Sequence, residues 1–145
     1  MARRNIDVDA VDFSQAIGML VRRSRAVATP DELSWTETGV LKRLARDGPM
    51  TTADLARAQG MRPQSMRTVL ASLEQLDMVE RKPHATDGRQ VNIVLTAKGT
   101  AAQKRAGDAK RTWIAQVISR LDAQEQETLF EAGRIIKRLV ENERV

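Results

Sequence analysis

The segment that most restricts the fold is TDGRQVNIVLTAKG, residues 86–99, because it combines a tight turn with a strand. Residues 87–89, Asp-Gly-Arg, have turn chemistry, since Asp and Gly tolerate the backbone angles of a tight loop. From Gln90 to Leu95, polar and apolar residues alternate, which is the period of a half-buried strand. The preceding stretch MVERK, residues 78–82, supplies a second strand. The sequence therefore predicts a β-hairpin with an arginine at its tip.

Two short helices joined by a glycine precede this hairpin. The first is predicted for ADLARAQ, residues 53–59, behind Thr51, whose hydroxyl can cap free backbone N–H groups. After the turn at Gly60, Pro63 favours a new helix start, where a missing N–H is tolerated. A helix-turn-helix followed by a hairpin predicts a winged helix. Apolar residues at helical spacing predict the buried side of the second helix: Met66, Val69, Leu70, Leu73 and Leu76.

Helical patterns flank this region on both sides. Residues 8–27 carry apolar side chains three and four positions apart, and Thr96 is a plausible N-cap for a helix that continues to about residue 121. The S-x-x-E spacing at residues 34–37 predicts a capping box, and D-x-x-E at residues 122–125 predicts the start of a last helix. The expected fold class is mainly α with a small β-hairpin wing, a winged helix-turn-helix flanked by N- and C-terminal helices.

The first and last helices each carry an apolar stripe outside the winged-helix core. Because closed two-fold dimers are the commonest soluble oligomers, we expect a second copy of the chain to cover these stripes. The alternative is that the two helices pack on each other within one chain. The expected organisation is an N-terminal dimerisation helix (residues 1–32), a winged helix-turn-helix lobe (33–96) and C-terminal dimerisation helices (97–145).

Composition narrows the classes of function. The net charge of +5 favours an anionic partner, either nucleic acid or an anionic membrane surface. The absence of cysteine removes disulfides and thiolate metal sites. No apolar run approaches the roughly 20 residues that span a bilayer, and the N-terminus lacks the apolar stretch of a signal peptide. We therefore expect a soluble, cytoplasmic protein.

From about Leu33 to Gly99, the sequence resembles the multiple-antibiotic-resistance regulator (MarR) family of winged-helix transcription factors. The most specific match is Asp87-x-Arg89 followed by Leu95-Thr96-x-x-Gly99, which is similar to the family's wing signature. The resemblance implies a homodimer that binds a pseudo-palindromic operator, represses nearby genes and releases DNA when a small, often aromatic or anionic, ligand binds. The chain departs from the family at Arg62, where a capping Ser is usual, and at Asp77, where Gly is usual.

The second helix of the helix-turn-helix carries the candidate base-reading residues. A helix in the major groove reads base edges with residues near its N-terminus. Gln64 can pair with adenine and Arg67 with guanine, whereas Ser65 or Thr68 can contact several bases or a phosphate. Arg62 adds positive charge, and no acidic residue lies between Leu55 and Leu73. The alternative is an ordinary solvated polar face, but the neighbouring wing favours DNA reading.

Arg89 at the hairpin tip is the candidate minor-groove contact. Arginine is favoured in a narrow A·T-rich groove because that groove focuses negative potential. Asp87, two residues away, could hold the guanidinium in place, and the family resemblance assigns the pair these roles. The alternative is an ordinary solvated turn arginine. Arg81, Lys82 and His84 flank the wing and are more plausible as phosphate neighbours than as base readers.

Enzymatic and metal-dependent functions find no support in the sequence. His84 is the only histidine, and without Cys or a second His it does not define a transition-metal site. The sequence has no phosphate-binding glycine motif, and we identify no catalytic residue and no cofactor site. We therefore expect a chain that is not an enzyme.

Effector binding is implied by the family resemblance alone. Met19, Arg22, Arg23 and Trp35 fall in segments that could line a pocket between the dimerisation helices and the DNA-binding lobe. Trp35, at a helix start, could equally be a packing residue. A winged helix can also serve as a protein-interaction module without sequence-specific DNA binding. The face formed by Gln64, Arg67, Thr68 and Arg89 is neither apolar nor acidic, which favours DNA.

Overall fold

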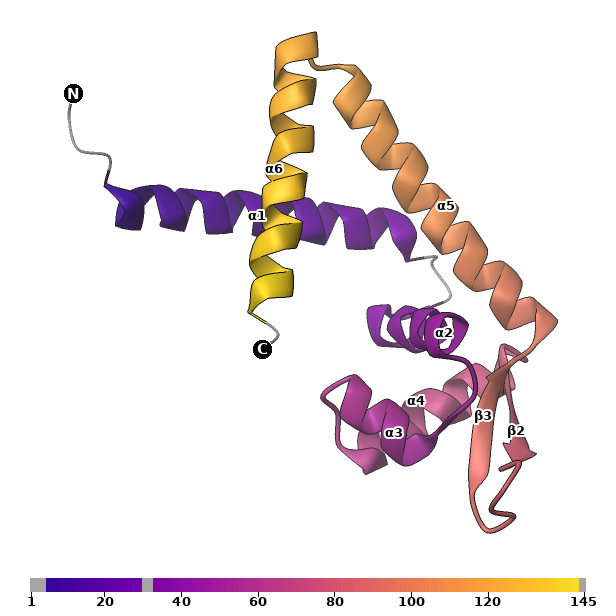
Figure 1. Cartoon of the computed structure of the whole chain (residues 1–145). Coiled ribbons are helices and arrows are strands. Elements are labelled where there is room, and N and C mark those ends of the chain that lie inside the picture. The colour runs from indigo at the N-terminus through magenta and orange to yellow at the C-terminus, as the bar shows by residue number, and fades with distance from the viewer. Residues whose placement is uncertain (1–4, 30–32, 144–145) are drawn as a thin grey trace. The chain divides into compact units, whose positions relative to one another are not determined.

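The computed structural model describes residues 5–29 and 33–143, and it confirms the mainly α fold with a small β wing (Figure 1). The chain divides into two compact units, residues 1–110 and 111–145. The described elements follow one another as α1 (Ile6–Ala28), α2 (Trp35–Asp47), β1 (Met50–Thr51), α3 (Thr52–Ala58), α4 (Pro63–Gln75), β2 (Val79–Pro83), β3 (Val91–Leu95), α5 (Ala97–Ser119) and α6 (Ala123–Asn142).

The core of the first unit lies where α2, α3 and α4 pack against one another and against β3. Aliphatic side chains build it, because the chain has few aromatic residues. The predicted buried side of α4 is confirmed for Met66, Leu70 and Leu73, while Val69 and Leu76 are half-buried at its edge. The largest fully buried side chains are Val40, Leu41, Leu55, Met66, Leu70, Leu73 and Ile93.

The predicted helix starts are present with their capping hydrogen bonds. Ser34 Oγ accepts from the Glu37 N–H at 3.1 Å, and Glu37 Oε1 accepts from the Ser34 N–H at 3.0 Å, which completes the capping box of α2. Thr51 Oγ1 accepts from the Asp54 N–H at the start of α3. Thr96 Oγ1 accepts from the Gly99 N–H at 3.1 Å at the start of α5. As expected from its side chain, Arg62 makes no side-chain cap for α4.

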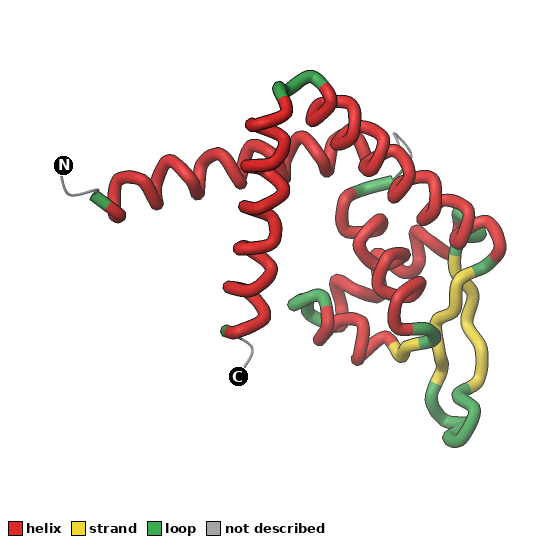
Figure 2. Tube along the Cα trace, turned by 45° about the horizontal axis from the view of Figure 1, so that its top comes forward, coloured by secondary structure: helices red, strands yellow, loops and turns green. Residues whose placement is uncertain are grey.

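The sheet has one strand more than the sequence predicted. β2 and β3 form the expected antiparallel hairpin, with Arg81 opposite Ile93, and the short β1 pairs with the other edge of β3. A two-residue strand is too short to display an alternating pattern, which is why β1 was missed. Figure 2 shows the hairpin projecting beyond α2–α4, with its loop at the far end. The sheet therefore anchors the wing to the helix-turn-helix through β1.

A left-handed residue joins α4 to the wing. Asp77 has φ 56°, the conformation for which glycine is favoured. Its N–H donates to Glu74 O, and the Met78 N–H donates to Leu73 O, so two carbonyls at the end of α4 are satisfied. The interpretation of Asp77 as a glycine-like position is confirmed.

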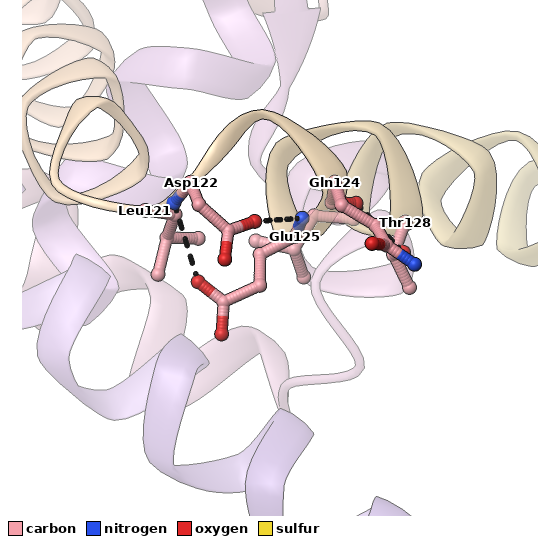
Figure 3. Close-up of a pocket in the computed structure, with 6 residues that line it drawn as sticks. Leu121, Asp122, Gln124, Glu125 and Thr128 are labelled. Atoms are coloured by element: carbon pink, nitrogen blue, oxygen red, sulfur yellow. Dashed lines mark hydrogen bonds between the residues drawn. The ribbon is translucent and has the colours of Figure 1, made fainter.

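The second unit contains the end of α5 and all of α6. Asp122 Oδ1 accepts from the Glu125 N–H at 2.8 Å, and Glu125 Oε2 accepts from the Asp122 N–H at 3.3 Å (Figure 3). This confirms the predicted start of the last helix. These capping residues line a hollow, together with the other side chains that Figure 3 draws as sticks. The carboxylates of Asp122 and Glu125 are used in starting α6, so we do not interpret this hollow as a ligand site.

Large apolar side chains are exposed on α1 and α6 in the single chain. On α1 they include Val8, Phe13, Leu20 and Val21, whereas Ile17 and Val27 of the predicted stripe are half-buried. On α6, Leu139 is 61% exposed and Phe130 is 47% exposed. Among the described helices, none is long and apolar enough to cross a membrane. Large exposed apolar side chains of this kind are typical of an interaction surface.

Candidate nucleic-acid interface

Helix α4 buries one side and presents the predicted base-reading residues on the other. Met66, Leu70 and Leu73 are fully buried, which fixes the rotation of the helix about its axis. The side chains of all five candidates on this helix and its N-cap are exposed: Arg62, Gln64, Ser65, Arg67 and Thr68. The structure thus places these residues where a ligand can reach them, and their individual contacts with DNA stay predictions.

An open hollow of about 560 Å³ lies between the start of α3, α4 and the wing strands. Arginines from three different elements line it, Arg57 from α3, Arg67 from α4 and Arg81 from β2. Gln90, just before β3, lies at the same hollow. Such a concave surface with converging guanidinium groups is suited to a phosphate backbone.

The three arginines differ in how far the protein already neutralises them. Arg57 Nη1 lies 3.1 Å from Asp54 Oδ1, and Arg81 Nε lies 2.7 Å from Glu74 Oε1. Within the described part of the chain, Arg67 makes no ion pair, so its guanidinium is free for an incoming ligand. Arg67 is therefore the strongest candidate of the three for a direct contact.

Arg81 and Lys82 have protein partners that the sequence did not reveal. The Arg81–Glu74 ion pair ties β2 to the end of α4, and Lys82 Nζ lies 3.3 Å from Glu80 Oε1. We therefore interpret Arg81 first as a link between the wing and α4. A phosphate contact by either residue remains a prediction.

The wing tip carries Arg89 on a loop that hydrogen bonds organise. The predicted contact between the Asp87 carboxylate and the Arg89 guanidinium is replaced by another: Asp87 Oδ1 accepts from the backbone N–H of Arg89 at 3.1 Å. Asp and Asn commonly make this bond two residues along a turn. Asp87 thus fixes the backbone of Arg89, and the exposed guanidinium is left without an ion pair among the described residues.

Contacts from Arg43 and Glu37, which sequence reasoning missed, connect α2 to the helix-turn-helix. Arg43 of α2 reaches the end of α3, where Nε donates to Gln59 Oε1 at 3.2 Å and Nη2 donates to Ala58 O at 3.4 Å. The largely buried Glu37 accepts from Ser72 Oγ of α4 at 2.9 Å. The two residues of each contact are far apart in sequence, so no short spacing motif indicates the contact. These contacts position α3 and α4 relative to α2.

The effector-binding candidates are not brought together by any described contact. Met19, Arg22 and Arg23 are exposed on α1. Trp35 is 54% exposed, and its ring lies under the guanidinium of Arg25, 3.8 Å from ring centroid to Cζ. The sequence analysis did not identify Arg25 as a candidate.

Among the described residues, no group of three or more His, Cys, Asp or Glu side chains could hold a metal ion.

The buried core of α2–α4, the exposed arginine-bearing face of α4 and the projecting hairpin define a winged helix-turn-helix protein. A sequence model of the MarR family matches residues 32–90. An uncharacterized HTH-type transcriptional regulator, ML2140, of Mycobacterium leprae is 33% identical over 91% of this chain and 92% of its own length. The HTH-type transcriptional repressor Rv2887 of Mycobacterium tuberculosis is 35% identical over 76% of this chain and 85% of its own length. The chain belongs to the MarR family of transcriptional regulators.

Solved structures share this fold along nearly the whole chain. RV1404 from Mycobacterium tuberculosis superposes with a TM-score of 0.82 at 23% identity, covering 95% of each chain. A MepR mutant from S. aureus, bound to an oligodeoxyribonucleotide, gives 0.69 at 19% identity over 91% of this chain and 96% of its own. PcaV from Streptomyces coelicolor, in complex with its natural ligand, gives 0.60 at 17% identity over 95% and 98%. The family and the relatives identify a transcriptional regulator rather than an enzyme.

Proposed function

We propose that the protein is a ligand-responsive repressor that binds a pseudo-palindromic operator as a homodimer. The observation that carries this proposal is the exposed, unpaired Arg67 on α4 within the same lobe as the exposed Arg89 at the wing tip. In this proposal α4 reads the major groove through Gln64, Ser65, Arg67 and Thr68, and Arg89 enters the adjacent minor groove. A relative named as a transcriptional repressor and a DNA-bound protein of the same fold support it.

The proposed division of labour assigns residues 33–96 to DNA binding, and residues 1–32 and 97–145 to dimerisation. This functional division differs from the two compact units, residues 1–110 and 111–145, because a dimer interface can draw on both units. The exposed apolar side chains of α1 and α6 support it, since a second copy of the chain would remove them from water. Two copies would place one winged helix on each half of a palindrome.

Sedimentation at micromolar concentration should give twice the chain mass. Leu139→Lys, at a 61% exposed position of α6, should shift the protein toward the monomer because the dimer would bury the new charge. Val91→Lys changes an exposed apolar residue of the wing strand and should stay dimeric. A parent chain that sediments as a monomer with its full helix content by circular dichroism would contradict the proposal.

We propose a small aromatic or anionic effector on the basis of family membership. The Arg25–Trp35 pair, a cation stacked on an exposed indole, supports a ligand of this chemistry near the start of α2. Met19, Arg22, Arg23 and Trp35 are the proposed lining residues. Aromatic carboxylates and phenols should weaken operator binding, as measured by fluorescence anisotropy of labelled DNA. A broad panel that changes neither operator affinity nor melting temperature would count against this part of the proposal.

A further inference from the structure

The wing loop, residues 84–90, is organised around the imidazole of His84. His84 Nδ1 lies 3.2 Å from the backbone nitrogens of both Thr86 and Asp87, and 3.2 Å from Thr86 Oγ1. Backbone N–H groups are donors only, so Nδ1 must accept from them and must carry no proton. A neutral imidazole in this arrangement holds its proton on Nε2. The half-buried His84 therefore caps the turn that leads to Arg89.

Further bonds close the loop behind this cap. The His84 N–H donates to Gln90 O at 2.9 Å, and the Gln90 N–H donates to Asp87 O at 3.0 Å. Asp87 Oδ1 then accepts from the Arg89 N–H at 3.1 Å. The sequence of contacts runs from the His84 ring to the Asp87 backbone, and from the Asp87 carboxylate to the Arg89 backbone. The position of Arg89 thus depends on His84 through Asp87.

We propose that His84 is a positioning residue that preorganises the wing tip for DNA. This inference rests on the proposed function, in which Arg89 contacts DNA. Without an acceptor at the Nδ1 position, two loop N–H groups form hydrogen bonds with water instead, and the loop samples more conformers. Ordering that loop on binding then lowers affinity. Because a net hydrogen bond contributes about 0.5–1.5 kcal/mol, the expected loss is about two- to tenfold in affinity per half-site.

Two amide variants separate this role from a direct contact through Nε2. The side-chain oxygen of His84→Asn can occupy the position of Nδ1, whereas His84→Gln extends its amide toward the position of Nε2. We expect the Asn variant to keep operator affinity close to that of the parent and the Gln variant to bind about two- to tenfold more weakly per half-site. Melting temperatures of both should stay near that of the parent, because the loop lies outside the core. If the Gln variant keeps operator affinity and the Asn variant loses it, the proposal is wrong and a phosphate contact by Nε2 is favoured instead.

Amide hydrogen exchange of the free dimer tests the cap without DNA. Exchange at Thr86 and Asp87 should be slow in the parent and in the Asn variant, and faster in the Gln variant. Imidazole ¹⁵N shifts should identify the Nε2–H tautomer. Equal exchange in all three proteins would overturn the proposal. A Gln variant that exchanges faster but binds the operator as tightly as the parent would also overturn it, provided that Arg89→Ala still weakens binding. If Arg89→Ala has no effect on binding, the proposed wing–DNA contact fails, and the positioning role in DNA binding fails with it.

Discussion

Arg67→Ala should weaken operator binding by about 1–3 kcal/mol per half-site and relax the preference at one base position, because a bidentate guanine contact is lost. The effect should appear on both half-sites of a palindrome, so the total loss should reach about 2–6 kcal/mol. The structure supports this choice of residue. Arg67 is exposed on the side of α4 opposite the core and carries no ion pair among the described residues.

A charge-matched control separates base reading from general electrostatics. Arg120→Ala removes the same charge from an exposed position just after α5, in the second unit. It should change affinity little and leave base preference as it is. Titrations on the operator and on single-base substitutions would show the difference. Equal base preference in the parent and in Arg67→Ala would contradict a base contact by Arg67.

Gly99→Ala should lower the free energy of unfolding by about 3 kcal/mol or more, because the added methyl group meets backbone rather than a yielding side chain. An ideal Cβ at Gly99 would lie 2.0 Å from Met78 O and 3.2 Å from Leu95 Cδ2. Separating these groups would pull the first turn of α5 away from the base of the wing. That turn is fixed there by the Thr96 N–H, which donates to Met78 O at 3.1 Å, and by the Thr96 hydroxyl, which donates to Asp77 O.

Urea unfolding followed by circular dichroism measures this effect. Thr100→Ala places the same residue at the next, exposed position of α5 and should change stability by less than about 0.5 kcal/mol. If Gly99→Ala is as stable as Thr100→Ala, the close approach of α5 to Met78 is wrong. The sequence alone identified Gly99 only as part of a wing signature, and the structure supplies the physical reason for a residue without a side chain.

Local chemistry was predictable because it depends on neighbouring residues. The capping boxes at Ser34 and Asp122 and the N-cap at Thr96 all depend on groups within a few positions. The buried side of α4 was predictable for the same reason, since its spacing follows the helix period. These features also defined the winged helix, and hence the face on which the candidate DNA-binding residues lie.

Contacts between elements could not be predicted in this way. Arg43 with Gln59, Glu37 with Ser72 and Arg81 with Glu74 join residues whose proximity depends on how helices and strands pack. The two-residue β1 has no period to detect. The sequence predicted only a phosphate contact for His84. Its role as a hydrogen-bond acceptor depends on the path of the wing loop, which the sequence does not define.

The most direct test of the proposed DNA contact compares Arg89→Ala with the parent on the operator over a series of salt concentrations. The minor groove barely distinguishes A·T from T·A, so the variant should bind many sequences more weakly. Any sequence preference that it loses should concern only groove width and A·T content in the flanks. The slope of log affinity against log salt should flatten by roughly 0.9 for each phosphate charge no longer neutralised, on both half-sites. If Arg89→Ala binds every DNA as tightly as the parent, with the same slope, the wing does not contact DNA and the proposed mode of binding is wrong.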